Sequence, residues 1–398
     1  MGYSQSFLKE FMIKVKEDRL YSLFFSSDND YQKSRSLIEL KRSTWRFIIK
    51  FYQDKSYGHR AFKKLPMGDD IKIYKLTANL IKAVNNGDIK KGMEILRELI
   101  FDKDRLRLNI SSLKKGKINY RMRGRDDYNL YKKEDMFHIP FDLLKVVPSY
   151  RYSISGFPCL YLGASLYSCW EETRRPELEK VNFSAFMNIR QMKFIDVLCP
   201  NNIDSTDNLV RFIIFALCTS FVSTNNDDNK FKFQYVIPEL LLSLLVSERN
   251  NGNVAVKGVD GIKYLSTRYF RDAEMFGVEP VFYNYVIPIR QYKDEGHCPK
   301  LINTFRVTDA KANFDHVLRR NKYNVPRTRI NNYSSSLFAV LEKNLWSKKD
   351  FGKVNVLFSA LTPAHKNITF AASTLKQKSY AERKSQLSGS LRSVSAVQ

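Results

Sequence analysis

Apolar residues recur at three- and four-residue steps through the first part of the chain, which is the spacing of amphipathic helices. Residues 6–25 and 69–101 both show this spacing. Within the second segment, the turn 85–87 predicts the end of one helix, and Asp88 is placed to cap the next. We therefore predict a helical accessory domain over residues 1–114, in which no motif for chemistry stands out.

The pattern changes to a two-residue alternation at Ile118, Tyr120 and Met122, which is typical of a strand with one buried face. Short apolar or alternating runs predict further strands at 157–163, 191–200 and 279–289. Residues 253–270 predict a strand, a turn at Asp260-Gly261 and a second strand. Helical periodicity falls between these strands, at 165–175, 206–222 and 237–250.

Strands and helices mix without the regular alternation of a doubly wound fold, so the predicted class is α+β, with a mixed β core over residues 115–310. The sequence contains neither the glycine-rich fingerprint of a Rossmann site nor a P-loop. Residues 311–366 predict a C-terminal helical extension. The Ser-, Lys- and Gln-rich residues 367–398 predict a disordered tail.

The composition is globular, with a strong positive charge. Of the 398 residues, 43% are hydrophobic and 13% aromatic, which is enough for a sizeable core. The net charge of +25 is compatible with nucleic acid, an anionic membrane face, an acidic protein or a phosphate-bearing ligand, and it does not choose among them. Because the basic residues spread along most of the chain, a general lysine bias of the source proteome fits equally well.

Cysteine and histidine usage gives no sign of a disulfide framework or a metal site. The five cysteines form no close pair and their number is odd, which predicts reduced, buried thiols in a cytoplasmic protein. The five histidines are scattered, so no metal is expected. The sequence has no run of 18 uncharged apolar residues, and its N-terminus does not resemble a signal peptide, so we expect no membrane association.

Residues 150–176 combine core-like runs with two adjacent acids. Gly156-Phe157-Pro158 leads into a predicted strand at 159–162, and Ser165 is placed to cap the helix that follows. On that helix, Ser165, Ser168, Cys169 and Glu172 lie broadly along one stripe, so small residues leave room above a carboxylate. The alternative is that Glu171 and Glu172 are solvated first-turn acids that favour the helix dipole.

Four ordered motifs between residues 120 and 288 resemble the RES family, toxins named for an Arg, a Glu and a Ser. The motifs are "YR" at Tyr120-Arg121, "RYSISGFPCLYL" from Arg151, "SLYSCWEE" from Ser165, and "GIKYLSTR", which carries Ser266 and Arg268. Tyr152 replaces the usual Trp of the second motif. The family is related in fold to ADP-ribosyltransferases, so the resemblance implies an ADP-ribosyltransferase-like mixed β core.

The resemblance also implies an enzyme that uses NAD⁺ as substrate and cleaves its nicotinamide–ribose bond by hydrolysis or phosphorolysis, with phosphate as acceptor in the second case. A carboxylate, Glu172 or Glu171, would stabilise the oxocarbenium-like ribose. Ser266 would donate a hydrogen bond to the ribose or a phosphate. The groups implied to hold NAD⁺ are Arg121, Arg123, Arg151, Tyr161 and Arg268.

Each of these residues has a structural alternative. Arg121 can pair with Asp126 or Asp127, Arg151 can anchor its loop, and Tyr161 can be a core tyrosine with a satisfied hydroxyl. Ser266 can cap the next turn.

Two other functions stay open: transfer of ADP-ribose to a macromolecule, and nucleic-acid binding driven by the charge. The toxin interpretation implies a restraining partner, typically an Xre-type antitoxin, or an N-terminal domain that holds the activity off. A role in bacterial defence and a homo-oligomer are both compatible with it.

Overall fold

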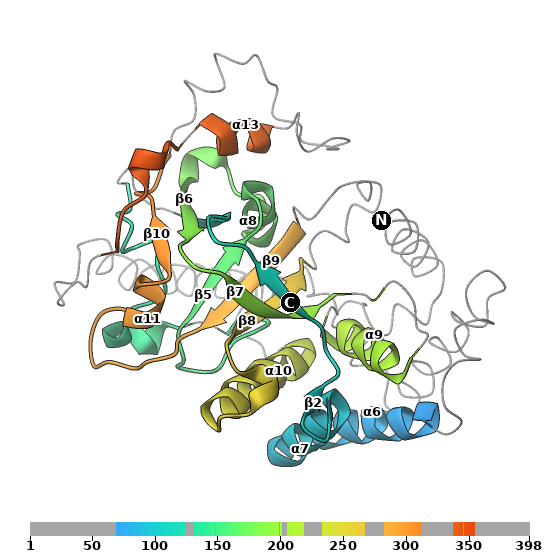
Figure 1. Ribbon diagram of the computed structural model, residues 1–398. Coiled ribbons are helices and arrows are strands. Elements are labelled where there is room, and N and C mark those ends of the chain that lie inside the picture. Colours follow the sequence, from blue (N-terminus) through green and yellow to red (C-terminus); the bar gives the residue numbers. More distant parts are fainter. Residues whose placement is uncertain are drawn as a thin grey trace, which may run out of the picture. The chain divides into compact units, whose positions relative to one another are not determined.

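An eight-stranded mixed sheet forms the centre of the computed structural model (Figure 1). Its strand order is β10-β6-β4-β5-β9-β8-β7-β3, and among the described strands only β7 and β8 pair in parallel. The strands are β3 (Ile110–Leu113), β4 (Ile118–Gly124), β5 (Cys159–Gly163), β6 (Val181–Asn188), β7 (Met192–Val197), β8 (Val259–Leu265), β9 (Tyr283–Pro288) and β10 (Phe305–Val307). A separate hairpin consists of β1 (Phe101–Asp102) and β2 (Arg105–Leu106).

The structure describes residues 69–124, 130–147, 149–198, 200, 205–218, 233–266, 282–312, 337–344 and 346–354. They all belong to one compact unit, 1–355, and a second unit covers 356–398. The helix predicted at 6–25 and the predicted tail lie outside the described residues. Arg268, Cys199, Asp126 and Asp127 do so as well.

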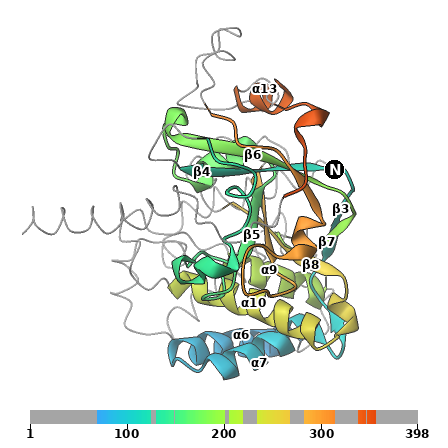
Figure 2. The ribbon, with the colours of Figure 1, turned by 90° about the vertical axis from the view of Figure 1, so that its left-hand side faces the viewer.

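The described helices are α6 (Asp69–Asn85), α7 (Ile89–Ile100), α8 (Leu166–Glu172), α9 (Thr206–Cys218), α10 (Phe233–Asn250), α11 (Pro299–Ile302) and α13 (Leu337–Asn344). Short 3₁₀ turns occur at Phe141–Val146, Leu178–Lys180, Val254–Val256 and Lys348–Asp350. Figures 1 and 2 show α6, α7 and α10 side by side, and α9 contacts both α6 and α10. Helices together with a mixed sheet confirm the predicted α+β class.

Two hydrophobic clusters cover the two faces of the sheet. In β5, Cys159 belongs to the cluster that contains α6, α7, α9 and α10, whereas Leu160 and Leu162 belong to the cluster around α11. This alternation means that β5 is buried on both faces, which explains its nearly continuous apolar sequence. The free thiols of Cys159, Cys169, Cys218 and Cys298 are all buried, as predicted.

A capping residue, Asp88, marks the start of the second helix of the pair predicted at 69–101. The Asp88 side chain accepts a hydrogen bond from the Lys91 amide at 3.0 Å, and α7 begins at the next residue after Asp88, as expected from the sequence. The boundary predicted at residue 114 falls between β3 and β4, which both belong to the large sheet. The division into domains stays a prediction.

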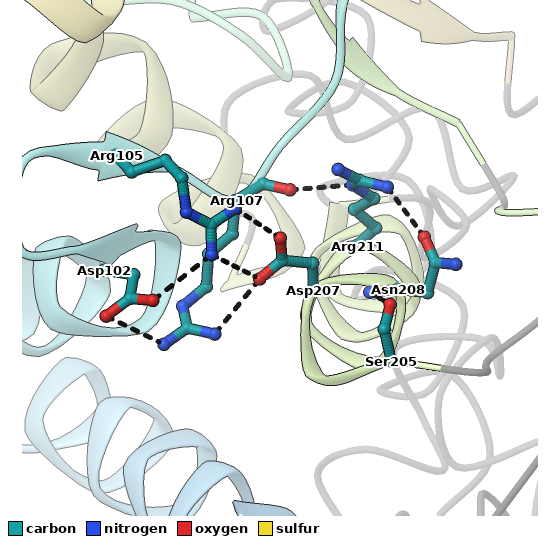
Figure 3. Close-up of polar contacts among 7 residues, drawn as sticks. All are labelled: Asp102, Arg105, Arg107, Ser205, Asp207, Asn208 and Arg211. Carbon is teal, nitrogen blue, oxygen red and sulfur yellow. Dashed lines mark hydrogen bonds and ion pairs between the residues drawn. The ribbon is translucent and has the colours of Figure 1, made fainter. Parts of the chain in front are cut away.

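An ion-pair network joins the β1–β2 hairpin to the start of α9 (Figure 3). Asp207 accepts hydrogen bonds from Arg105 at 2.5 Å and from Arg107 at 3.1 Å. Asp102 lies 3.2 Å from Arg105 on the other side. Asp207 and Asp102 therefore neutralise most of the arginine charge in this network. The network is a structural link between the β1–β2 hairpin and α9, which lie about 100 residues apart in the sequence.

The prediction of a turn at Asp260-Gly261 is wrong, because both residues lie inside the single strand β8. Asp260 is 1% exposed and accepts hydrogen bonds from Arg190 at 2.6 and 3.0 Å and from Arg290 at 2.8 Å. A Cβ on Gly261 would lie 1.9 Å from the Val286 carbonyl oxygen of the neighbouring strand. In this pair, Asp260 therefore accepts hydrogen bonds from arginines, and Gly261 allows the backbone of β9 to approach closely.

The sheet separates between β4 and β5, and this separation positions the candidate site. β4 pairs with β6 along its whole length but meets β5 at a single position, Tyr120 with Gly163. Figure 2 shows β4 and β6 running across the direction of β5. Residues that follow Tyr120 on β4 therefore lie where the two strands part.

Candidate active site

Helix α8 lies directly after β5 and packs against β4 at the point where the strands part. Ser165 caps it as predicted, since its Oγ accepts a hydrogen bond from the Ser168 amide at 2.9 Å. A Cβ on Gly163 would lie only 2.7 Å from the Cys169 sulfur, so the helix is pressed against the end of the strand. Cys169 in turn donates from its thiol to the Tyr120 carbonyl at 3.2 Å. The position of α8 is therefore set by contacts with both strands.

Glu171 and Glu172 occupy the last turn of this seven-residue helix, so the interpretation as first-turn acids is wrong. Glu171 is 4% exposed and forms an ion pair with Arg175, with contacts of 2.8, 3.0 and 3.0 Å. Arg174 and Arg175 have φ values of 70° and 54°, a left-handed conformation that side chains disfavour. The Arg175 guanidinium also lies over the Trp170 ring. Glu171 thus helps to hold the strained turn that ends α8.

Glu172 turns the other way, toward the centre of the sheet. Asn284 on β9 donates from Nδ2 to Glu172 Oε1 at 2.8 Å, and Ser168 donates from Oγ to Asn284 Oδ1 at 2.7 Å. Asn284 pairs with Gly163 of β5 and with Tyr264 of β8. The structure therefore separates the two acids: Glu171 serves the helix end, and Glu172 faces the strands.

Arg121 is the residue after Tyr120 on β4, immediately past the junction with β5. Its Nη1 donates to the carbonyl oxygens of Phe137 and Met136, the latter at 3.3 Å. Burial, and then the nearby charge of Arg123, lower the pKa of Arg121 to about 10, so it stays charged at neutral pH. Among the described residues no carboxylate lies within ion-pair distance of it. An incompletely compensated cation at this junction can accept an anionic group.

The charges of Glu172 and Arg121 both affect the pKa of the Cys169 thiol. Burial is the main reason why the pKa of the Cys169 thiol rises to about 12. The negative charges of Glu342 and Glu172 raise this pKa further, and the positive charge of Arg121 lowers it. The elements that carry these two charges, α8 for Glu172 and β4 for Arg121, pack against each other.

Arg123 points to the same side of β4 as Arg121, as the spacing predicts. It donates to the Asp135 carbonyl, and its guanidinium lies 5.2 Å from the centre of the Tyr131 ring. Directly opposite on β6 is Asn182, which is fully buried and whose amide has no hydrogen-bond partner in the described part of the chain. Arg123 and Asn182 extend the polar groups of the junction along the β4–β6 pair.

Arg151 and Tyr161 both donate hydrogen bonds to backbone carbonyls, as expected if Arg151 anchors its loop and Tyr161 is a core tyrosine with a satisfied hydroxyl. Arg151 is 8% exposed and donates to the Cys218 carbonyl at 3.1 Å, which fastens its loop to the end of α9. The Tyr161 hydroxyl donates to the Tyr152 carbonyl at 2.7 Å. Tyr161 lies on β5, two residues before Gly163, where this strand meets β4 at Tyr120.

Ser266 follows β8 and is completely buried. Its amide donates to the Phe282 carbonyl at 3.0 Å, and its Oγ has no hydrogen-bond partner among the residues that the structure describes. The role of Arg268, the companion of Ser266 in the same motif, stays a prediction. Glu172, Arg121 and Tyr161 thus lie on three elements that contact one another, α8, β4 and β5, and the Ser266 Oγ makes no hydrogen bond within the described residues.

Asn284 and Glu342 are part of this site and had no distinct signal in the sequence. Asn284 is a single amide within the aromatic, β-branched run 279–289. Glu342 on α13 accepts a hydrogen bond from the Leu166 amide at the start of α8, at 2.6 Å. Both contacts join residues more than 100 positions apart, so only the tertiary structure reveals them.

In the described ranges, no group of three or more His, Cys, Asp or Glu side chains is arranged to hold a metal ion. Over the same ranges, no helix combines the length and the apolar character that crossing a membrane requires.

Part of the chain is similar to a curated protein that is named as a toxin. The chain is similar to "Putative toxin YopC" of Bacillus subtilis (strain 168), with 33% identity over 245 residues. The match covers 56% of this chain and 53% of that protein, so it spans about half the length of the curated relative. No protein-family model matches the chain, and no solved structure matches it.

Proposed function

We propose that this protein is a toxin-like enzyme that cleaves the nicotinamide–ribose bond of NAD⁺, built on an ADP-ribosyltransferase-like core of the RES type. The observation that carries the proposal is the packing of α8, which bears Glu172, against β4, which bears Arg121, at the β4–β5 junction. These are two of the residue types for which the RES family is named, and they come from two separate motifs. The similarity to a protein named as a toxin supports the biological part of the proposal.

The chemistry suits a carboxylate held in a protein interior. As the C–N bond breaks, both bonding electrons leave with the nicotinamide nitrogen, and positive charge develops on the ribose. The Glu172 carboxylate stabilises that charge, because electrostatic interactions are strong where water is excluded. A water or phosphate oxygen then attacks the anomeric carbon and loses its proton to solvent, which gives ADP-ribose or its 1-phosphate.

The arginines supply the groups that a dinucleotide needs. Guanidinium groups bind phosphate oxygens in a fork geometry, and Arg121 and Arg123 project from the same side of β4. Ser266 has an Oγ that makes no hydrogen bond within the described ranges, and it is assigned to a ribose or phosphate oxygen. Arg151 and Tyr161 support the wall of the site, because their polar atoms bind backbone carbonyls.

An enzyme that consumes NAD⁺ harms its own cell unless it is restrained. We therefore extend the proposal to a protein partner of the antitoxin type, such as an Xre-type protein, which occludes the site until it is removed. The N-terminal residues are a second source of restraint.

The decisive experiment incubates the purified protein with NAD⁺ and measures free nicotinamide, in buffers with and without inorganic phosphate. If water is the acceptor, release is expected in both buffers; if phosphate is the acceptor, release requires phosphate and gives ADP-ribose 1-phosphate. Glu172→Gln should lower the rate of release about 10²- to 10³-fold, whereas the same change at the exposed Glu179 should not. A Glu172→Gln variant that releases nicotinamide at the wild-type rate would refute the assigned chemistry. Transfer of label from NAD⁺ to a macromolecule without free ADP-ribose would identify a transferase instead.

A further inference from the structure

Three polar side chains form a continuous hydrogen-bonded chain beneath α8. Ser168 Oγ donates to Asn284 Oδ1 at 2.7 Å, and Asn284 Nδ2 donates to Glu172 Oε1 at 2.8 Å. Ser168 is completely buried and Asn284 is 4% exposed. Buried polar side chains in such a chain are costly unless each partner is present, so this arrangement is unlike a surface contact.

The first hydrogen bond fixes the second. The oxygen of an amide side chain only accepts hydrogen bonds, and the nitrogen only donates them. Because the Ser168 hydroxyl binds Oδ1, the amide of Asn284 is oriented with Nδ2 toward Glu172. An N–H group aimed at one carboxylate oxygen holds that oxygen and thereby fixes the orientation of the carboxylate.

The chain is mounted on rigid elements. Asn284 is inside β9, where its backbone pairs with Gly163 on one side and Tyr264 on the other. Ser168 is on the first turn of α8, and the Ser165 cap binds its amide. Precise positioning of a reacting group requires supporting residues of this kind, whose own side chains cannot rotate.

We propose that Asn284 and Ser168 are positioning residues, which hold the Glu172 carboxylate at the angle from which it stabilises the ribose cation. The inference rests on the proposed function and adds two residues to it. Asn284 acts through Glu172, and Ser168 acts through Asn284. Their loss should therefore lower the rate of the chemical step more than the affinity for NAD⁺.

The kinetic test compares Asn284→Ala and Ser168→Ala with a matched control, Asn188→Ala. Asn188 is also a completely buried asparagine on a strand, but its amide donates to the carbonyls of Lys114 and Arg190. We expect kcat for nicotinamide release to fall about 10- to 100-fold in Asn284→Ala, the loss typical of a hydrogen bond to a charged group. KM should change less than about threefold, because the lost contact does not involve bound substrate. Per folded molecule, the control should keep kcat within about twofold of the wild type.

A second measurement needs no substrate. Urea unfolding of Asn284→Ala, Glu172→Ala and the double variant gives the coupling between the two side chains, which should be about fivefold or more in the unfolding equilibrium constant. If Asn284→Ala does not fold, Ser168→Ala replaces it in the same cycle.

The outcomes separate the two ideas. If the wild type releases no nicotinamide, the proposed function fails. The coupling then tests by itself whether Asn284 holds the Glu172 carboxylate, and a value below about twofold refutes that contact. With release, an unchanged kcat in Asn284→Ala or a coupling below about twofold overturns the positioning role.

Discussion

Isosteric changes at Glu171 and Glu172 should have opposite effects on stability and activity. Glu171→Gln removes the charge of a 4% exposed side chain that makes contacts of 2.8, 3.0 and 3.0 Å with Arg175. Breaking a fully buried pair costs about 3–5 kcal/mol. The Arg175 side chain is 38% exposed and can be rehydrated, so we expect a smaller loss of unfolding free energy, about 1–2 kcal/mol.

Glu172→Gln should leave the fold nearly intact. Glu172 accepts a hydrogen bond from the neutral amide of Asn284, and a glutamine oxygen can accept the same bond. We expect the unfolding free energy to change by less than about 1 kcal/mol. The rate should fall about 10²- to 10³-fold, as when one preorganised electrostatic group is removed from an active site.

The assay combines urea unfolding with nicotinamide release, and the rate is normalised to the folded fraction. Glu171→Gln should shift the urea midpoint and keep the normalised rate within about threefold. Glu172→Gln should leave the urea midpoint nearly unchanged and lower the normalised rate. If Glu171→Gln abolishes release without a shift in midpoint, the two acids have been assigned the wrong way round. If both variants keep the wild-type rate, no carboxylate of this helix takes part in the reaction.

Three further predictions concern stability. Asp260→Asn should cost about 1–3 kcal/mol in urea unfolding, because it removes the buried charge that pairs with Arg190 and Arg290, whose side chains are 43% and 22% exposed and can be partly rehydrated; an unchanged urea midpoint would contradict these ion pairs. Gly163→Ala should cost about 1–3 kcal/mol, because its Cβ would lie 2.7 Å from the Cys169 sulfur; an unchanged urea midpoint would contradict the close contact. Burial raises the pKa of Cys159, Cys169 and Cys218 from 9.0 to about 12, so the stability that their neutral thiols contribute is complete below about pH 9 and is lost toward pH 12. Unfolding free energies at pH 9 and 10 should differ by about 1 kcal/mol per thiol, and equal values would show that the thiols titrate normally.

Elements specified by local sequence could be predicted. The strand expected at 159–162 is β5, and the helix after it begins where Ser165 was expected to cap it. Asp88 likewise defines the start of α7. Caps, glycine turns and apolar runs act over a few residues, so their consequences can be read without knowing the tertiary structure.

Features that depend on distant partners could not be predicted. Asp260-Gly261 is a typical turn pair, and only the approach of β9 and the arginines around Asp260 explain why it lies within a strand. The same limit applies to the site. The motif containing Glu172 is local, but the amide that holds its carboxylate comes from Asn284, more than 100 residues further along the chain.

The adjacent acids at 171 and 172 have a geometric explanation. Successive residues of an α-helix project about 100° apart, so a pair of neighbours cannot face the same surface. The ion pair between Glu171 and Arg175 and the strained turn that follows fix the rotation of α8 about its axis. With that rotation fixed, Glu172 must project toward β9, where Asn284 receives it. The first acid therefore determines the direction of the second, and a chain with only one glutamate here would hold its carboxylate less firmly.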